Sequence, residues 1–195
     1  MPLHVCAPPR WARAAKRRNV SRRPVIFLDI DDVLAINEHF TGVHVAEAFR
    51  TDELDQQEMW EQLMLPEAVA NLRALHEEFW PQYVISSSWA TFFDREQMRE
   101  IFNRTHLEFV AKNLHKSWTT PKGLGPSRLW EIETWLRLHR RAKHSVLVLD
   151  DYESGRALQS SPLDEKHCII LCDVRCGFTT DKLALARTIL NAQTT

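Results

Sequence analysis

From residue 24 onward, short apolar runs alternate with longer stretches in which apolar residues recur at helical spacing. The apolar runs are typical of buried strands, and five are expected, at 24–29, 82–86, roughly 107–112, 145–150 and 167–172. Helices are expected between and after them, near 54–64, 66–79, 93–103, 126–140 and 180–192. Strands separated by helices require crossover connections. The pattern therefore predicts an α/β fold: a doubly wound, parallel five-stranded sheet with helices on both faces.

Polar side chains follow three of these apolar runs, at the point where each predicted strand ends. They are Asp29, Asp31 and Asp32 after the first run, Ser86–Ser88 after the second and Asp150–Asp151 after the fourth. In an open α/β sheet, ligands bind beyond the carboxyl ends of the strands. The three groups are therefore expected to converge on one site.

These carboxylates and hydroxyls favour phosphoryl chemistry at a metal ion. Like charge at the end of a buried strand is costly unless a cation neutralises it. Magnesium prefers one or two carboxylates together with a substrate phosphate, and the serines open a predicted helix, where a phosphate is stabilised. The alternative for the aspartates is a surface turn after a core strand, since Asp is common in turns.

Composition narrows the function classes. A chain of 195 residues, 44% of them hydrophobic, buries one sizeable core, which indicates one domain with decorations. Its five glycines form no GxGxxG or Walker-type loop, so a nucleotide-cofactor or kinase function has no support. No apolar run approaches the roughly 18 residues of a membrane span, so no membrane association is expected. The four cysteines form no disulfide framework, which favours the cytoplasm.

The net charge of −1 hides a basic segment at the start of the sequence. Residues 1–23 contain seven Arg or Lys and no acidic residue, and no apolar segment of the kind a secretory signal needs. Basic side chains neutralise phosphates, so the segment could attract a polynucleotide; the alternative is a solvated tail. We expect residues 1–23 to form a flexible arm outside a domain that spans 24–195.

Several motifs, in the same order, resemble those of the haloacid-dehalogenase-like (HAD) phosphohydrolase superfamily. They are LDIDDVL (28–34) for the first motif, VISSSW (84–89) for the second and VLVLDD (146–151) for the fourth. Further signatures are similar to one branch, the HAD domain of Swiss Army Knife RNA-repair proteins. These are the helix RLWEIETWL (128–136), His167 and GFT (177–179). The resemblance covers roughly residues 24–192 and implies a HAD-like Rossmannoid fold.

The resemblance also implies a mechanism and a cofactor. Asp29 would be the nucleophile that forms an aspartyl-phosphate, and Asp31 would protonate the leaving group and later activate water. A Mg²⁺ ion would be held by the side chain of Asp29, the backbone carbonyl of Asp31, and Asp150 or Asp151. A metal on one of two neighbouring carboxylates separates their pKa values, as two different roles require.

For the phosphate group, the resemblance implies a hydroxyl and a basic residue. Ser86 ends the apolar run and is expected to hydrogen-bond the phosphate with the Ser87 N–H as a helper, although the register leaves the choice between the two serines open. Arg128 matches the arginine of the branch's R-x-x-E-I pattern, and Lys122 is the competing choice. A cation besides the metal is needed because the transferred group is strongly anionic.

Two positions depart from the branch, and one nearby aromatic residue is a candidate substrate contact. Asp32 stands where the branch often has glycine, and its carboxylate could either tighten metal binding or repel an anionic substrate. Ala90 stands where the branch often has arginine after SSSW. Together the two departures leave a catalytically slow protein as an alternative. Trp89, beside the serines, is the tryptophan that we retain as a possible contact to substrate.

The segment 36–66 is expected to form a flap and a small insertion, too short for a full cap domain. An open site goes with large substrates in the superfamily, and the basic arm would suit a polynucleotide end. The sequence thus predicts a Mg²⁺-dependent phosphomonoesterase acting on a phosphorylated substrate, with a nucleic-acid end or nucleotide as the candidates. The alternatives are a phosphotransferase or dehalogenase on the same fold and a non-catalytic binding module. Nothing in the sequence indicates the oligomeric state.

Overall fold

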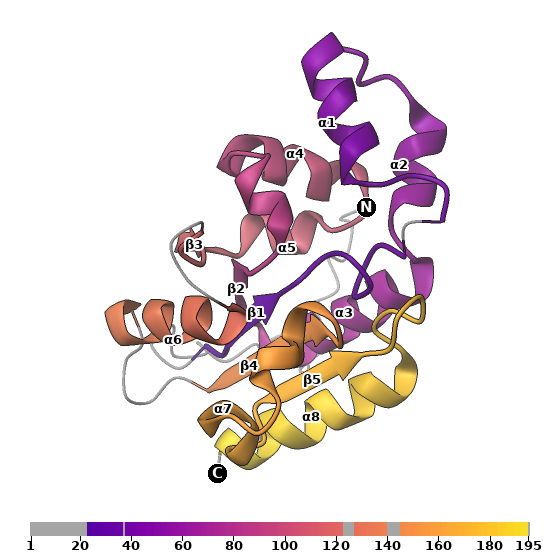
Figure 1. Cartoon of the computed structure of the whole chain (residues 1–195). Coiled ribbons are helices and arrows are strands. Elements are labelled where there is room, and N and C mark those ends of the chain that lie inside the picture. Colours follow the sequence, from indigo (N-terminus) through magenta and orange to yellow (C-terminus); the bar gives the residue numbers. More distant parts are fainter. Residues whose placement is uncertain (1–22, 37, 123–126, 140–144, 195) are drawn as a thin grey trace, which may run out of the picture.

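The computed structural model describes residues 23–36, 38–122, 127–139 and 145–194. Its centre is a sheet of five parallel strands in the order β3-β2-β1-β4-β5 (Figure 1). The strands are β1 (Val25–Leu28), β2 (Gln82–Ile85), β3 (Leu114–Thr119), β4 (Val146–Asp151) and β5 (Ile169–Cys172). The predicted α/β fold with an all-parallel five-stranded sheet is therefore confirmed.

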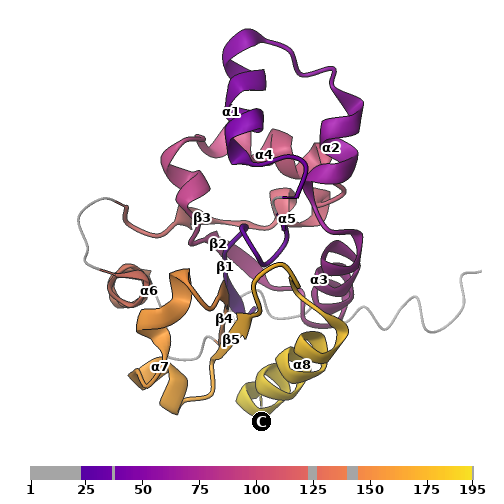
Figure 2. The ribbon, with the colours of Figure 1, turned by 45° about the vertical axis from the view of Figure 1, so that its right-hand side comes forward.

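Helices cover both faces of the sheet (Figure 2). On one side are α3 (Pro66–Phe79), α4 (Arg95–Arg104), α5 (Glu108–Lys112) and α8 (Thr180–Thr194). On the other are α6 (Arg128–His139), the short 3-10 helix η4 (Ser154–Leu158) and α7 (Pro162–Glu165). In β1, Ile26 and Leu28 belong to the core on the first side, and Phe27 packs edge-on against Trp135 of α6 on the second. Burial on both faces explains why the central strands are continuous apolar runs.

The segment between β1 and α3 forms two helices at the carboxyl edge of the sheet, α1 (Gly42–Thr51) and α2 (Gln57–Leu63) (Figure 1). We expected a flap over the residues that begin α1, followed by one short helix. The start of α1 is a capping box in which Thr41 accepts from backbone N–H groups while the His44 ring accepts from the Thr41 N–H at 3.1 Å. Histidine in place of the usual Glu or Gln conceals this signal in the sequence.

The predicted strand at 107–112 is wrong. That segment is helix α5, and the third strand follows it as β3. The N–H groups of Val110 and Ala111 donate to the Leu107 carbonyl, which closes the helical turn. β3 is an edge strand that pairs only with β2 among the described strands, and four of its six residues are partly or fully exposed. Its sequence, LHKSWT, is mostly polar, so it lacks the apolar run that identified the other four.

A 3-10 helix, η3 (Ser88–Thr91), begins three residues after the last residue of β2. The Ser87 hydroxyl accepts from the Trp89 N–H at 3.3 Å and caps this turn. The helix predicted after Ser88 thus begins as this single turn, and α4 starts seven residues later at Arg95.

Arg23 ties the start of the described chain to the amino edge of the sheet. Its guanidinium donates to the carbonyls of Trp80 and Pro81, each at 2.7 Å, and to the side chain of Asn113. These three acceptors precede β2 and β3. The rest of the predicted basic arm, residues 1–22, lies outside the described residues.

Over the part of the chain that the structure describes, no helix combines the length and the apolar character needed to cross a bilayer.

The segment 177–179 supports the loop that follows β1. The Phe178 N–H donates to the Val33 carbonyl at 2.8 Å, and the Phe178 carbonyl accepts from Asn71 at 2.8 Å. Gly177 has a φ of 68°, and a Cβ there would lie 3.0 Å from a Leu65 methyl and 3.2 Å from the Val33 carbonyl oxygen. Only glycine adopts this conformation without strain.

Gly177→Ala is therefore expected to lower the free energy of unfolding by about 1–2 kcal/mol, because a left-handed residue and a close contact coincide. Urea denaturation followed by circular dichroism measures the change. Ala184→Ser, at an exposed position of α8, is the control and should change stability by less than about 0.5 kcal/mol. Equal stability of Gly177→Ala and the wild-type protein would show that the loop accommodates alanine without a loss in the free energy of unfolding.

Candidate active site

The three central strands bring the predicted groups to one level of the sheet. Leu28 is the register partner of both Ile85 and Leu149, so the next residue of each strand, Asp29, Ser86 and Asp150, falls at the same height. The Asp29 N–H continues the ladder with the Leu149 carbonyl at 3.0 Å. The expected convergence at the carboxyl edge is thus what the structure has.

Three carboxylates meet at this edge. Asp29, Asp150 and Asp151 each place an oxygen within 4.8 Å of the others, and all three are buried, with 2%, 0% and 3% of their surface exposed. We call them the carboxylate cluster. The side chain of Asp31 lies apart from the cluster, so only its backbone carbonyl remains as the expected ligand from that residue.

The pKa values of the three carboxylates in the cluster are shifted in different directions. Burial raises the pKa of Asp29 to about 6, although the charge of Arg128 opposes the shift. Burial and the neighbouring Asp29 raise the pKa of Asp150 well above its ordinary range. The pKa of Asp151 is lowered despite burial, because its Oδ1 accepts from the N–H groups of Ser154 at 2.9 Å and Glu153 at 2.6 Å. Asp151 is thus the member of the cluster that the backbone keeps ionised.

Arg128, at the start of α6, is the cation in contact with the cluster. Its guanidinium lies 3.3 Å from an Asp29 oxygen and 2.8 Å from an Asp150 oxygen, with 9% of the side chain exposed. Burial lowers the pKa of Arg128, but these carboxylates raise it more. Lys122 instead pairs with Glu131 at 2.8 Å. Of the two candidate basic residues, the structure therefore brings Arg128 to the predicted nucleophile.

Glu131 is a site residue to which we assigned no role from the sequence. Its carboxylate is shared by Arg128 at 3.4 Å, Lys122 at 2.8 Å and the Thr120 hydroxyl at 3.2 Å. It lies one helical turn after Arg128, so the i, i+3 spacing of the R-x-x-E pattern was the available signal. Glu131 holds both cations on the side of the site that faces α6.

The two serines have different surroundings. The Ser87 hydroxyl hydrogen-bonds the Asp29 carboxylate and caps η3. The Ser86 hydroxyl is buried and has no hydrogen-bond partner among the described residues. A buried hydroxyl without a partner is costly, so Ser86 is the one with a free hydrogen bond to offer a ligand.

The carboxylates of Asp31 and Asp32 have different hydrogen-bond partners. Both carboxylate oxygens of Asp31 accept from the indole N–H of Trp89, at 3.1 and 3.0 Å, and Trp89 is 2% exposed. Asp32 has a left-handed φ of 56°, and its carboxylate accepts from the Arg175 N–H at 2.8 Å. Aspartate tolerates this conformation, which glycine adopts most readily. The Asp32 carboxylate is therefore engaged with the backbone rather than with the cluster.

The donor set of the cluster fits Mg²⁺. Buried oxygen ligands from two neighbouring strands suit a hard cation. Counting Glu131, four carboxylates of the described residues surround two cations, Arg128 and Lys122, so negative charge is in excess. Burial raises the pKa of Asp29 and of Asp150, and the charge of Asp29 adds to the shift of Asp150. A divalent cation would neutralise the excess negative charge.

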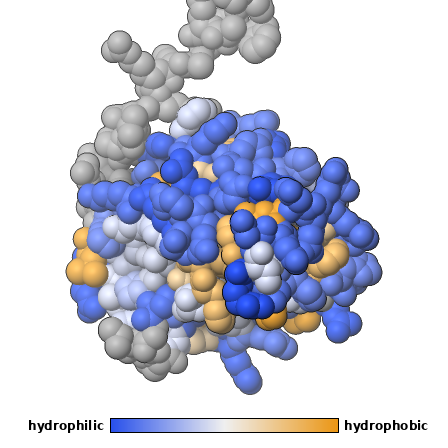
Figure 3. Space-filling model, turned by 90° about the horizontal axis from the view of Figure 1, so that it is seen from above, coloured by the Kyte–Doolittle hydropathy of each residue, from blue (hydrophilic) through white to orange (hydrophobic). Residues whose placement is uncertain are grey.

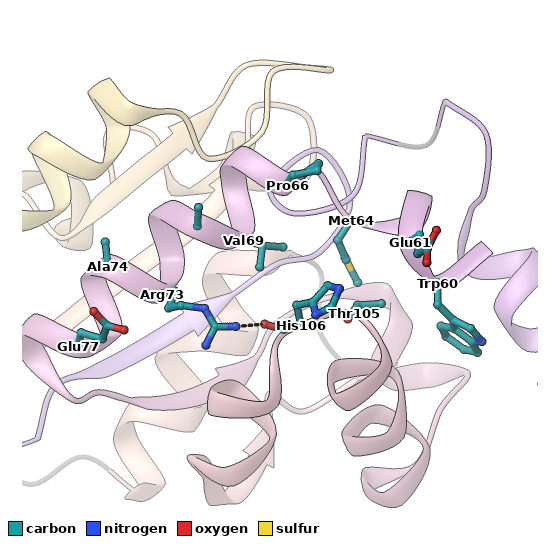
Figure 4. A pocket seen from close by; sticks show the side chains of 11 residues that line it. Trp60, Glu61, Met64, Pro66, Val69, Arg73, Ala74, Glu77, Thr105 and His106 are labelled. Atoms are coloured by element: carbon teal, nitrogen blue, oxygen red, sulfur yellow. Dashed lines mark hydrogen bonds between the residues drawn. The ribbon is translucent and has the colours of Figure 1, made fainter. Parts of the chain in front are cut away.

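A separate pocket of about 440 Å³ lies between α2, α3 and the turn before α5 (Figure 4). Arg73 spans it and donates to the His106 carbonyl, while Trp60 and Met64 contribute apolar surface. None of its lining residues belongs to the carboxylate cluster. This pocket is therefore not part of the candidate active site.

Comparison with known proteins identifies the family. A model of the HAD domain in Swiss Army Knife RNA repair proteins matches residues 25–183. No curated protein and no solved structure matches the chain. The matched region contains all five strands and the carboxylate cluster. The chain therefore belongs to the family of HAD domains found in Swiss Army Knife RNA repair proteins.

Proposed function

We propose that the protein is a Mg²⁺-dependent phosphomonoesterase that works through an aspartyl-phosphate on Asp29. Its family supports a HAD-type hydrolase, a phosphatase in general. The observation that carries the finer proposal is the contact of Arg128 with Asp29 inside the carboxylate cluster. It combines a buried carboxylate with a cation placed to neutralise a transferred phosphoryl group.

In the first step, an oxygen of Asp29 attacks phosphorus while the bond from phosphorus to the leaving oxygen breaks. Asp31, in its acid form, donates its proton to that oxygen and becomes a carboxylate. In the second step, this carboxylate accepts a proton from water as the water oxygen attacks phosphorus, which releases phosphate and restores Asp29. The two carboxylates can perform different tasks because one lies in the cluster and the other at Trp89.

Asp29 and Asp151, with Asp150 beside them, would hold the metal together with the Asp31 backbone carbonyl. When bound, Mg²⁺ supplies positive charge to the phosphoryl oxygens and keeps the cluster ionised. Arg128 contributes the second positive charge from the α6 side. The Ser86 hydroxyl, buried and without a partner among the described residues, offers a hydrogen bond to a phosphoryl oxygen.

For the substrate, we propose a phosphorylated polynucleotide end. The family model is described for RNA repair proteins, and the helices of the described part of the insertion are the short α1 and α2. The face that carries this insertion is mainly hydrophilic (Figure 3). The basic residues of 1–22 would add phosphate contacts.

A phosphatase screen tests the proposal. The full chain is assayed with nucleotides, oligonucleotides bearing 3′ or 5′ phosphates, and sugar phosphates, each with Mg²⁺ and with EDTA. We expect Mg²⁺-dependent phosphate release, fastest from oligonucleotide ends. Preference for sugar phosphates would overturn the substrate class, and absence of release from every substrate would overturn the phosphatase. Equal phosphate release with Mg²⁺ and with EDTA would exclude a role for the metal.

Removal of the metal is also expected to change the pH dependence of stability. The folded pKa of Asp29, about 6, exceeds its ordinary value of 3.8, so the folded state binds the proton more tightly than the unfolded state does. The stability contributed by Asp29 is therefore lost as pH rises between these two values. In EDTA, Asp29→Asn should gain stability relative to the wild-type protein across this range, and saturating Mg²⁺ should abolish the gain. Urea denaturation at several pH values measures the difference in stability between the variant and the wild-type protein. A difference that does not change with pH in EDTA would contradict the prediction.

A further inference from the structure

Trp89 connects the proposed proton donor to the insertion. Its indole N–H donates to both carboxylate oxygens of Asp31, at 3.1 and 3.0 Å. The ring is buried and packs against Phe93 with centroids 5.6 Å apart. Its own backbone N–H donates to Ser87, whose hydroxyl also contacts Asp29. The ring is thus held from the core side and from the backbone.

The remaining side of the indole is closed by Gly42, the first residue of α1. A Cβ at Gly42 would lie 3.0, 3.1 and 3.3 Å from three atoms of the indole, one of them the donor nitrogen itself. A Cβ at this position would require the ring to move by a few tenths of an ångström. The insertion is therefore packed directly on the nitrogen that holds Asp31.

We propose that Trp89 is a positioning residue that sets the Asp31 carboxylate for proton transfer, and that Gly42 of the insertion sets Trp89. The proposal rests on the phosphatase function proposed above. An indole N–H is a donor only, so it fixes the orientation of the carboxylate without competing for the proton. It differs from our expectation that Trp89 contacts substrate, because the ring is buried.

The physical reason is the short range of proton transfer. A general acid must lie within about 2.6–3.2 Å of the atom that it protonates, and a misplacement of about 1 Å can cost 10²-fold in rate. Asp31 lies on a partly exposed turn after the strand has ended, so the sheet itself does not hold its side chain. The indole N–H supplies that constraint.

The leaving group distinguishes positioning from general damage. An aryl phosphate such as p-nitrophenyl phosphate has a leaving oxygen that departs without a proton, whereas an alkyl phosphate requires protonation. Trp89→Phe, which keeps a ring and removes the donor, should lower kcat/KM, which reports formation of the aspartyl-phosphate, by about 10–100-fold for the alkyl phosphate and by less than about 3-fold for the aryl phosphate. The dissociation constant of either phosphate should be unchanged, since the buried ring does not touch substrate.

Three further variants sharpen the test. Trp60→Phe is the matched control, because Trp60 is also buried and donates its indole N–H, at 2.9 Å, to the Leu54 carbonyl; it should leave both rates unchanged. In an Asp31→Asn background, Trp89→Phe should have no further effect on the alkyl phosphate, since the coupled pair is already broken. Gly42→Ala should reproduce part of the alkyl-specific loss.

The contact itself has a readout that does not depend on activity. In ¹H–¹⁵N spectra, the indole signal that disappears in Trp89→Phe should shift in Asp31→Asn and stay in place in Asp32→Asn, whose carboxylate accepts from Arg175 instead. Equal losses on both phosphates, or an indole signal indifferent to Asp31, would overturn the positioning role. If the wild-type protein hydrolysed neither phosphate, the proposed phosphatase function would be wrong, even if the indole signal responded to Asp31 as expected.

Discussion

Asp29→Asn is expected to reduce phosphatase turnover by about 10⁴-fold or more, because no covalent intermediate can form without the nucleophile. The substitution keeps the size of the side chain and removes its charge. Since Asp29 is buried beside two other carboxylates, the variant should fold and be at least as stable as the wild-type protein without metal. Steady-state phosphate release with Mg²⁺ measures the effect.

Asp31→Asn is the informative comparison. It keeps the nucleophile but removes the group that activates water, so the aspartyl-phosphate should accumulate when an aryl phosphate is supplied. Mass spectrometry of the quenched protein should show the phosphate on the peptide that contains Asp29. Residual turnover of Asp29→Asn within about 10-fold of the wild-type protein would assign the nucleophile elsewhere.

Arg128→Met is expected to produce the second large effect, a loss of about 3–5 kcal/mol in the free energy of unfolding without metal, since it leaves buried carboxylates unpaired. Arg128 contacts both Asp29 and Asp150 with its guanidinium. The loss should be greater at neutral than at acidic pH, because the unpaired carboxylates are charged at neutral pH and become protonated in acid. Turnover should fall by about 10³-fold even with Mg²⁺, as the phosphoryl group loses its second cation.

Lys122→Met is the matched control for charge and burial. Lys122 is a partly buried cation of the same site, but it pairs with Glu131 rather than with the cluster. Its replacement should cost clearly less stability and less turnover than that of Arg128. Denaturation in EDTA and in Mg²⁺, with turnover assayed in parallel, compares the two. Equal effects would show that either cation serves the nucleophile.

The sequence predicted most of the sheet because its central strands are buried on both faces. β1, β2, β4 and β5 all correspond to apolar runs, and α3 begins at Pro66, where a helix start was expected. β3 escaped prediction because its sequence, LHKSWT, is mostly polar, whereas β5, the other edge strand, is an apolar run. α1 escaped because its cap uses His44, whose ring accepts a hydrogen bond that sequence rules assign to Glu or Gln.

The strand ends likewise predicted the positions of the site residues, but not their side-chain partners. The parallel register alone places Asp29, Ser86 and Asp150 at one level. Beyond the strand ends the chain follows no regular period, so no pattern predicted that Asp31 would meet Trp89. The choice between Arg128 and Lys122 depended on the direction of two long side chains, which only the three-dimensional structure supplies.

The anchoring of Arg23 determines where anything attached ahead of the domain begins. Its acceptors precede β2 and β3, whereas the carboxylate cluster follows β1 and ends β4. The four residues of β1 separate these two edges by about 13 Å at about 3.3 Å per residue. A tag, tether or neighbouring domain joined before Arg23 therefore starts from the edge opposite the cluster. Surface immobilisation through that end would leave the entrance to the site facing the solution.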